Sequence, residues 1–175
     1  PGTYGVLETQ PSGYRSVSDR DGGNPDEIRP ITVTAGATNS GNDFTEEQPG
    51  SISGQVMKDT DGDNDADDPL SGVVLRLLSS SGNPVFDGFG QPVTATTDVN
   101  GNYSFSALDP GSYQISQDQP SNYNSVSDTD GANNNRIGDQ TPVVVSAGQN
   151  NGGNDFLEIE LGVISGYVRT DDDNN

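Results

Sequence analysis

The sequence predicts an all-β fold, a seven-stranded β-sandwich that recurs in tandem repeats of about 110 residues. Apolar and polar residues alternate through Val73, Leu75 and Leu77, and again through Tyr103 and Phe105. This period of two is typical of half-buried strands, and no helical stripe of useful length is present. The second observation is internal repetition, because the segment that begins at Pro1 returns at Pro110.

The repeat sets the expected domain boundaries. Residues 1–22 return as residues 110–131, and both copies lead into a GNDF segment that ends at Phe44 or Phe156. The period is close to the size of one ordinary domain and far longer than a solenoid repeat. We expect three parts in a longer natural polypeptide: the C-terminal part of a preceding repeat at 1–49, a complete repeat at 50–161, and the first strand and start of the acidic loop of the next repeat at 162–175.

Seven strands are expected in the complete repeat from the alternation of its apolar residues. They are 51–58, 72–79, 92–97, 102–107, 111–117, 142–147 and 154–160. In an up-and-down arrangement, the loops after the first, third and fifth strands share one pole. The last strand ends at that same pole and leads into the next repeat.

Composition excludes several classes of protein. Only 28% of the residues are hydrophobic and there is no cysteine, so disulfides cannot stabilise this lean domain. The absence of histidine removes the usual zinc ligands and the Ser-His and Cys-His nucleophile arrangements. A formal net charge of −20 is unsuited to binding nucleic acid or an anionic membrane.

The strongest chemical signal is the acidic run that follows the first strand. Its aspartates are Asp59, Asp61, Asp63, Asp65, Asp67 and Asp68, with Gly62 at a tight bend. Side chains at alternate loop positions can converge, and six to eight converging oxygen ligands are what Ca²⁺ takes. The spacing is like the start of an EF-hand loop, but the glycine comes early and no helices flank it. We expect Ca²⁺ here; the alternative is a solvated acidic turn, and Mg²⁺ fits less well because it keeps its waters.

Two further loops are weaker candidates for Ca²⁺. One carries Asp128, Asp130, Asn133 and Asn135, and the N-terminal copy carries Asp19, Asp21 and Asn24. Here Asp, Asn and Gly can equally be turn residues. The other contains Asp98 and Asn100, where Asn100-Gly101 between alternating strands is also a hairpin signal. Both explanations remain open for these loops.

Several motifs together resemble a known family. ISGQV, the Asp-rich loop, PLSGVVLRLL, TTDVNGNYSFSALDPGSYQI and PSNYNSVSDTDG are similar to the B-type repeat of serine-aspartate repeat surface adhesins, calcium-binding relatives of the collagen-adhesin B domain. The resemblance implies a prealbumin-like or Ig-like β-sandwich that is rigid with calcium bound and serves as a stalk on an exported surface protein. It also implies first-loop ligands at Asp59, Asp61, Asp63, Asp67 and Asp68, with partial counterparts at Asp171 and Asp173.

The sequence departs from the collagen-adhesin relatives in its lysines. Many of those relatives carry a Lys-Asn isopeptide crosslink between the first and last strands. Here the only lysine is Lys58, and its counterpart in the next repeat is Thr170. We therefore do not expect a crosslink between Lys58 and Asn154.

The expected function is a structural repeat of a long extracellular filament or cell-surface adhesin stalk, rigidified by calcium. Its partners would be neighbouring repeats of the same polypeptide and other copies in a filament. The alternatives are an extracellular binding module for carbohydrate or a host protein, and an accessory domain of a secreted hydrolase. Catalysis by this segment is not expected, because its acids lie in Gly-rich and Asn-rich loops without tryptophan.

Overall fold

The computed structural model describes residues 1–170, and every regular element in that range is a β-strand. The N-terminal segment contains β1 (Gly2–Leu7), β2 (Arg15–Asp19), β3 (Glu27–Val33) and β4 (Phe44–Glu47). The longer strands of the remainder are β5 (Gly50–Asp59), β7 (Val74–Ser79), β9 (Asn102–Leu108), β10 (Gly111–Gln117), β11 (Tyr123–Asp128) and β15 (Phe156–Glu160). The shorter ones are β6 (Asp68–Pro69), β8 (Thr94–Thr96), β12 (Arg136–Ile137), β13 (Val143–Val145) and β14 (Asn150–Asn151).

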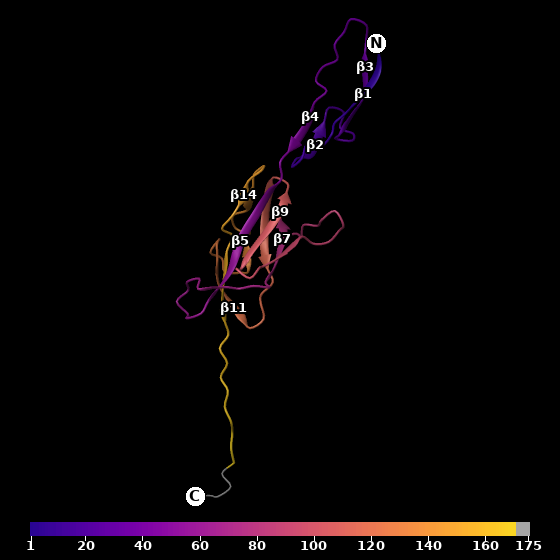
Figure 1. Cartoon of the computed structure of the whole chain (residues 1–175). Helices are drawn as coiled ribbons and strands as arrows, with labels where there is room; N and C mark the ends of the chain where they lie inside the picture. The colour runs from indigo at the N-terminus through magenta and orange to yellow at the C-terminus, as the bar shows by residue number, and fades with distance from the viewer. Residues whose placement is uncertain (171–175) are drawn as a thin grey trace.

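Residues 50–160 form two facing sheets (Figure 1). In the first, β10 lies between β7 and the successive short strands β12 and β13, and β8 pairs with the far edge of β7. In the second, β11 pairs with β15, β15 pairs in parallel with β5, and β9 and β6 pair with β5. The all-β sandwich that the alternation predicts is therefore confirmed.

The core lies between these sheets because inward residues of both join in one cluster. Ile52, Val56 and Phe156 come from the second sheet, and Leu75 and Ile115 come from the first. Each is at most 1% exposed. Alternate positions of a strand face opposite sides of the sheet, which is why polar residues can separate these core residues in the sequence.

The predicted strands are all present, but the segment after β10 differs from the expectation. It was expected to be one long loop, whereas its first half forms β11, which pairs antiparallel with β15 from Tyr123 opposite Glu160 to Asp128 opposite Phe156. The strand runs back along the sandwich and places its final aspartate beside the start of β15. The strand was not predicted because the residues toward both of its ends are polar and show no apolar alternation.

The N-terminal segment repeats pairings of the sandwich. Tyr4 pairs with Ile31 as Tyr113 pairs with Val143, and Asp19 pairs with Phe44 as Asp128 pairs with Phe156. In the same way, Val6 pairs with Ile28 as Ile115 pairs with Ile137. The two stretches of sequence therefore adopt the same strand pairing wherever both are present.

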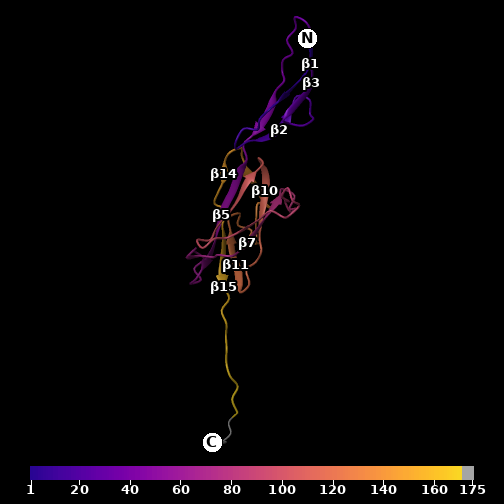
Figure 2. The same cartoon turned by 45° about the vertical axis from the view of Figure 1, so that its right-hand side comes forward.

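The chain enters and leaves the sandwich at opposite ends, as Figures 1 and 2 show. The N-terminal segment lies beyond the end where β5 starts, and residues 161–170 leave from the end where β15 stops. This follows from the parallel pairing of β5 with β15, since both strands run in the direction from entry to exit. No helix among residues 1–170 is long and apolar enough to span a membrane.

Candidate metal centre

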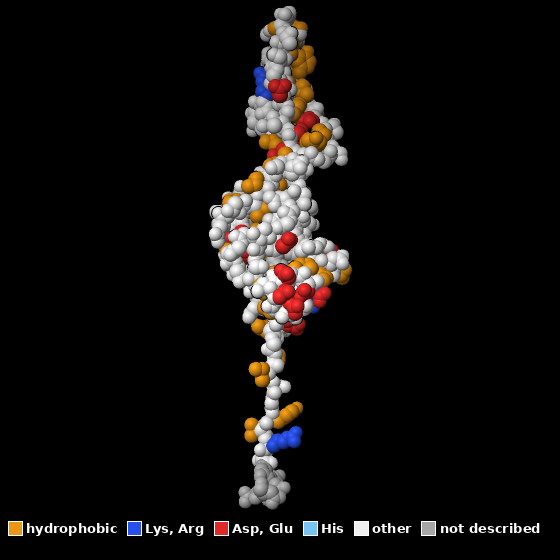
Figure 3. Space-filling view, turned by 90° about the vertical axis from the view of Figure 1, so that its left-hand side faces the viewer, with side chains coloured by type: hydrophobic (Ala, Val, Ile, Leu, Met, Phe, Trp, Pro, Cys, Tyr) orange, Lys and Arg blue, Asp and Glu red, His pale blue; other side chains and the backbone are white. Residues whose placement is uncertain are grey.

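The first acidic loop lies at the exit end of the sandwich. It leaves β5 at Asp59 and returns as β6, where Asp68 pairs with Lys58. The Asp67 backbone N–H donates to the Lys58 carbonyl, which closes the base of the loop at 3.1 Å. Figure 3 shows acidic side chains gathered near this end of the sandwich.

Asp59 organises the loop from within. Its side chain accepts hydrogen bonds from the backbone N–H groups of Asp61, Gly62 and Asn64 at 3.1, 2.6 and 3.0 Å. These bonds, the one from Gly62 above all, hold the pKa of Asp59 below its ordinary value. Gly62 has a φ of 85°, in the left-handed region that glycine adopts without steric cost. Asp59 is only 1% exposed, and the hydrogen bonds lower its pKa by more than burial raises it.

Three carboxylates converge in this loop. One oxygen each from Asp59, Asp61 and Asp67 lie within 4.8 Å of one another. Asp67 is held by the Thr60 backbone N–H and hydroxyl, both of which donate to its Oδ2 at 2.7 Å. The pKa of Asp61 is raised, first by the charge of Asp63 and further by Asp67 and Asp59. The loop thus concentrates negative charge that a bound cation would neutralise.

The other predicted ligands of this loop lie outside the three-carboxylate cluster. Asp63 accepts a hydrogen bond from the Asp65 backbone at 2.9 Å, and Asp68 lies 3.6 Å from the Lys58 ammonium. Among residues 1–170, the group that could hold a metal consists of Asp59, Asp61 and Asp67. Their carboxylate oxygens are the hard donors that Ca²⁺ prefers, so the donor set fits this ion.

The second cluster lies at the edge strand and not at the exit end. Asp128 closes β11 level with Phe156 and accepts backbone hydrogen bonds from Gly131 and Asn134 at 3.1 and 3.3 Å. Asp130 accepts hydrogen bonds from Ala132 at 3.2 Å and from Gly138 at 3.0 Å. These contacts are those of turn-forming aspartates, and calcium binding here stays a prediction.

Two asparagines of this cluster differ in their contacts. The carboxamide oxygen of Asn133 receives the Ser125 hydroxyl at 2.6 Å. In the described part of the chain, the Asn135 carboxamide oxygen is buried and has no hydrogen-bond partner. A buried oxygen of this kind is a free acceptor in the same loop as Asp128 and Asp130.

The N-terminal copy builds the same loop. Asp19 accepts the Asp21 and Gly22 backbone N–H groups at 3.0 and 2.8 Å, and Asp21 accepts that of Arg29 at 2.7 Å. The Asp21 bond to Arg29 is the counterpart of the Asp130 bond to Gly138. Asn24 receives the Asp26 backbone N–H at 3.3 Å, as a turn residue does.

Asp98 is occupied by its own hairpin turn. Its Oδ1 accepts the backbone N–H groups of Asn100 and Asn102 at 2.8 and 2.9 Å. Hydrogen bonds from Asn102, then Asn100, lower its pKa. These bonds are those of a turn residue, and calcium binding at Asp98 stays a prediction. Asp171 and Asp173 lie outside the described residues.

The three predicted clusters do not form a single site, but the first and second loops lie side by side, since Asp65 and Asp128 line one pocket. Strand pairing places Asp59 opposite Ile159, whereas Asp128 is level with Phe156 and Asn102 is level with Gln55. Along β5 at 3.3 Å per residue, Asp128 is about 10 Å and Asn102 about 13 Å before Asp59, on opposite sides of that strand. Because β9 runs antiparallel to β5, Asp98 and Asn100 lie nearer the end of β5 than Asn102 does. The second cluster is shifted along the sheet from its expected position because the loop after β10 contains β11, which runs back beside β15.

A buried polar contact in the sandwich was not predicted. Glu158 is 0% exposed, and its carboxylate accepts hydrogen bonds from the side chains of Gln117 at 2.6 Å and Gln119 at 2.5 Å. Burial raises its pKa, and the two amide donors oppose that rise. The alternation that places Phe156 in the core assigns Glu158 to the same face, so the sequence did contain a signal.

A Lys58–Asn154 crosslink is not compatible with this arrangement. The pairing of β5 with β15 sets Lys58 beside Glu158. The Asn154 carboxamide instead donates to the carbonyls of Ser53 and Asn151, both at 3.0 Å. Asn154 therefore anchors the start of β15.

Fold and loop together define a β-sandwich module with an acidic loop at its exit end. The family model of the SdrD B-like domain matches residues 50–159, and the chain belongs to that family. Serine-aspartate repeat-containing protein F of Staphylococcus epidermidis is 26% identical over 162 residues. That alignment covers 83% of this chain, which spans about 9% of the length of this relative.

The solved structures that match this chain include pilins. The minor pilin GBS52 of Streptococcus agalactiae matches with a TM-score of 0.49 and 16% identity, over 78% of this chain and 61% of that one. The shaft pilin SpaA of Lactobacillus rhamnosus GG matches with a TM-score of 0.45 and 16% identity, over 93% and 66%. Both TM-scores are below 0.5, and the sandwich is established by the strand pairing of this chain itself. None of these names describes an enzyme.

Proposed function

We propose that this chain is a structural repeat of a long extracellular filament or cell-surface adhesin stalk, and that Ca²⁺ bound in the first acidic loop makes it rigid. The observation that carries the proposal is the parallel pairing of β5 with β15, because the chain enters at one end and leaves at the other. Membership of the SdrD B-like family supports the surface location. The partners are neighbouring repeats of the same polypeptide and other copies in the filament, with no nucleic acid and no membrane in contact with this segment.

The length of the unit suits a spacer. β5 spans the sandwich with ten residues, so one unit contributes about 30 Å along the chain before its loops are added. The length of a stalk built from such repeats grows in proportion to their number, since each repeat begins where the previous one ends. A net charge of −20 keeps such a rod soluble.

Asp59, Asp61 and Asp67 would hold the ion, and the ion would supply the positive charge that the loop lacks. Without it, their mutual repulsion opposes closing of the loop. With it, binding to the folded state alone stabilises that state by mass action. The loop lies next to Glu160, with which it lines one pocket, and that strand leads out of the sandwich, so an ordered loop supports the exit of the chain.

The test compares the full chain in millimolar calcium and in excess EDTA. We expect a higher melting temperature and slower cleavage within residues 59–68 when calcium is present. Magnesium at the same concentration is the control for nonspecific screening. Identical melting and cleavage in calcium and EDTA would show that the acidic loop is a solvated turn, and the rigid-stalk proposal would then lose its calcium component.

A further inference from the structure

The connection between the N-terminal segment and the sandwich is short. β4 ends at Glu47, and Gln48 and Pro49 connect it to Gly50 at the start of β5. β2 pairs with β4 so that Arg15 lies opposite Glu47. Arg15 is therefore carried to the end of the N-terminal segment that faces the sandwich.

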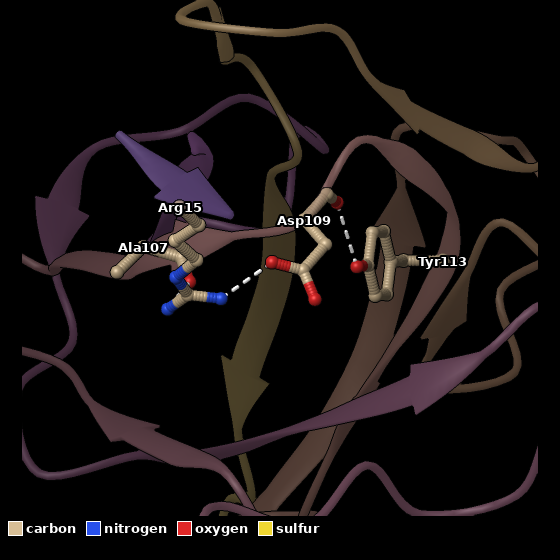
Figure 4. A network of polar contacts seen from close by, with 4 residues as sticks. All are labelled: Arg15, Ala107, Asp109 and Tyr113. Atoms are coloured by element: carbon tan, nitrogen blue, oxygen red, sulfur yellow. Dashed lines mark hydrogen bonds and ion pairs between the residues drawn. The ribbon is translucent and has the colours of Figure 1, made fainter. Parts of the chain in front are cut away.

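Arg15 reaches across this joint with both terminal nitrogens. Nη1 donates to Asp109 Oδ1 at 2.5 Å, and Nη2 donates to the Ala107 carbonyl at 2.7 Å. Figure 4 shows the guanidinium directed at Asp109, on the turn that leads from β9 into β10. The planar guanidinium can form both bonds at once, which lysine cannot do with the same geometry.

The acceptor side is shaped by its own sheet. The pairing of β9 with β5 is irregular between Gly50 and Ile52, and Ala107 lies there with a φ of 55°. An alanine rarely adopts this left-handed conformation, and such residues cluster at functional positions. On the other side of Asp109, the Tyr113 hydroxyl donates to the Asp109 carbonyl at 2.8 Å. The irregular pairing and the tyrosine contact together position the backbone of Ala107 and Asp109, the two residues that Arg15 contacts.

The connection is held on its other flank by backbone contacts. The Gly148 N–H donates to the Gln48 carbonyl at 3.0 Å, and Ser51 donates to Gln149 at 2.9 Å. A Cβ at Gly50 would lie 2.5 Å from Val145 Cγ1, so the entering chain lies directly against this loop. These contacts position residues 48–51 but leave the far edge of the N-terminal segment to be fixed by Arg15.

We propose that Arg15 is an ionic latch that docks the end of one unit onto the Ala107–Asp109 edge of the next and so sets the angle between them. Of the four ion pairs among residues 1–170, only that of Arg15 joins the N-terminal segment to the sandwich. The whole chain has seven Lys and Arg against 27 Asp and Glu, so basic residues are scarce, and one of them lies at this joint.

The latch does not recur at the exit end of the sandwich. In the repeated strand pairing, Arg15 opposite Glu47 corresponds to Asn124 opposite Ile159. Pro49 in the connection corresponds to Leu161. A joint built with asparagine and leucine has neither the charge nor the fixed φ of proline. Successive joints of the polypeptide therefore differ in stiffness, with the joint before the sandwich the stiffer.

Pulsed electron paramagnetic resonance tests the latch on the full chain. The chain has no cysteine, so Thr32→Cys on β3 and Ser104→Cys on β9, both exposed, give one spin label on each side of the joint. We expect a single narrow distance distribution that broadens in Arg15→Asn, which introduces the residue found at the second copy. Asp109→Asn should broaden it similarly, and the double variant should be no broader than either single change.

The controls separate the latch from general charge effects. Arg29→Asn removes the Arg29–Glu27 pair at 3.0 Å, which lies within the N-terminal segment, and should leave the distribution unchanged. The Arg15–Asp109 pair is about half exposed, so its loss should raise the fraction of molecules with an undocked joint by roughly five-fold or less. In the parent chain this fraction should rise with salt concentration, because salt screens the ion pair. The measurement is made in calcium and in EDTA, since the latch contains no metal ligand. An unchanged distribution in Arg15→Asn would overturn the proposal whether or not calcium binds.

Discussion

The side-chain amide of Gln117 donates a 2.6 Å hydrogen bond to the carboxylate of Glu158, which has no exposed surface. The bond crosses the sandwich, because Gln117 ends β10 in one sheet and Glu158 lies in β15 of the other. The two sheets are thus joined by a polar contact near the end of the core from which the chain leaves. A buried acid of this kind makes stability depend on pH.

We predict the direction of this dependence. Burial raises the pKa of Glu158, so the folded chain binds the proton more tightly than the unfolded chain. This contribution to stability is greatest in acid and is lost as the pH rises through the folded-state pKa. Glu158→Gln should remove it, so that the stability of the variant relative to the parent is higher at pH 8 than at pH 4. Urea unfolding at both pH values measures this.

The matched control is Glu160→Gln, two residues further along β15 and exposed. It removes an exposed carboxylate from the same strand, so a pH-dependent difference confined to Glu158→Gln would identify burial as the cause. A glutamine at 158 also offers an N–H to the Gln117 carbonyl oxygen, which has no partner among the described residues. A relative stability of Glu158→Gln that stays constant from pH 4 to pH 8 would contradict the raised pKa.

Asp61→Asn separates metal ligation from turn formation. The Asp61 side chain accepts one backbone hydrogen bond, from Asp63 at 3.2 Å, which asparagine can also accept. We expect the variant to melt at a higher temperature than the parent in EDTA, because it lacks the negative charge that the neighbouring aspartates repel. In calcium it should melt at a lower temperature, because a ligand is lost. Differential scanning calorimetry in both buffers measures the direction of the change in melting temperature.

Asp43→Asn is the control for this change, since Asp43 is an exposed aspartate in the N-terminal segment, outside the three acidic loops. Asp118 is a poorer control because it forms an ion pair with Arg76 at 2.6 Å. A shift of the same sign for Asp61→Asn in both buffers would mean that the loop does not bind calcium through this residue.

Asp98→Ala should destabilise the chain to the same extent with and without calcium. The reason is that Asp98 accepts the Asn100 and Asn102 backbone N–H groups of its own hairpin. Thermal melting in calcium and in EDTA measures the effect, and Asp98→Asn, which keeps an acceptor, should retain most of the stability. A loss confined to calcium buffer would instead identify Asp98 as a ligand.

Tyr103→Phe should lower the free energy of unfolding by about 1 to 3 kcal/mol, because it leaves a buried carbonyl without its donor. The Tyr103 hydroxyl donates to the Asn154 carbonyl inside the sandwich, and burial raises the Tyr103 pKa. Tyr123→Phe, at a half-buried tyrosine on β11, is the control. Urea unfolding at pH 7 compares them, and equal effects at both positions would contradict a specific role for this bond.

The sequence predicted the strands with clear alternation and missed those without it. Ile52 and Val56, and likewise Leu75 and Leu77, mark β5 and β7 through their spacing. β11 has only Val126 as an aliphatic residue, so its pairing with β15 depends on tertiary contacts that no local pattern records.

The acidic loops show the same limit. The spacing of Asp59 and Asp61 predicts converging side chains, and in the structure one oxygen of each lies within 4.8 Å of the other and of an Asp67 oxygen. It could not distinguish them from Asp63 and Asp65, because which oxygens converge depends on the backbone path through Gly62 and Asn64. Arg15 and Asp109 are separated by 94 residues, and nothing in the sequence indicates that they meet.

The parallel pairing of β5 with β15 has a mechanical consequence. A load that pulls on the two ends of the sandwich acts along these adjacent strands in opposite directions, from the start of β5 and the end of β15. The interstrand hydrogen bonds from Val56–Phe156 to Asp59–Ile159 are then loaded in shear and share the force, instead of opening one after another. A unit connected in this way resists extension through the pair of strands that transmits the tension.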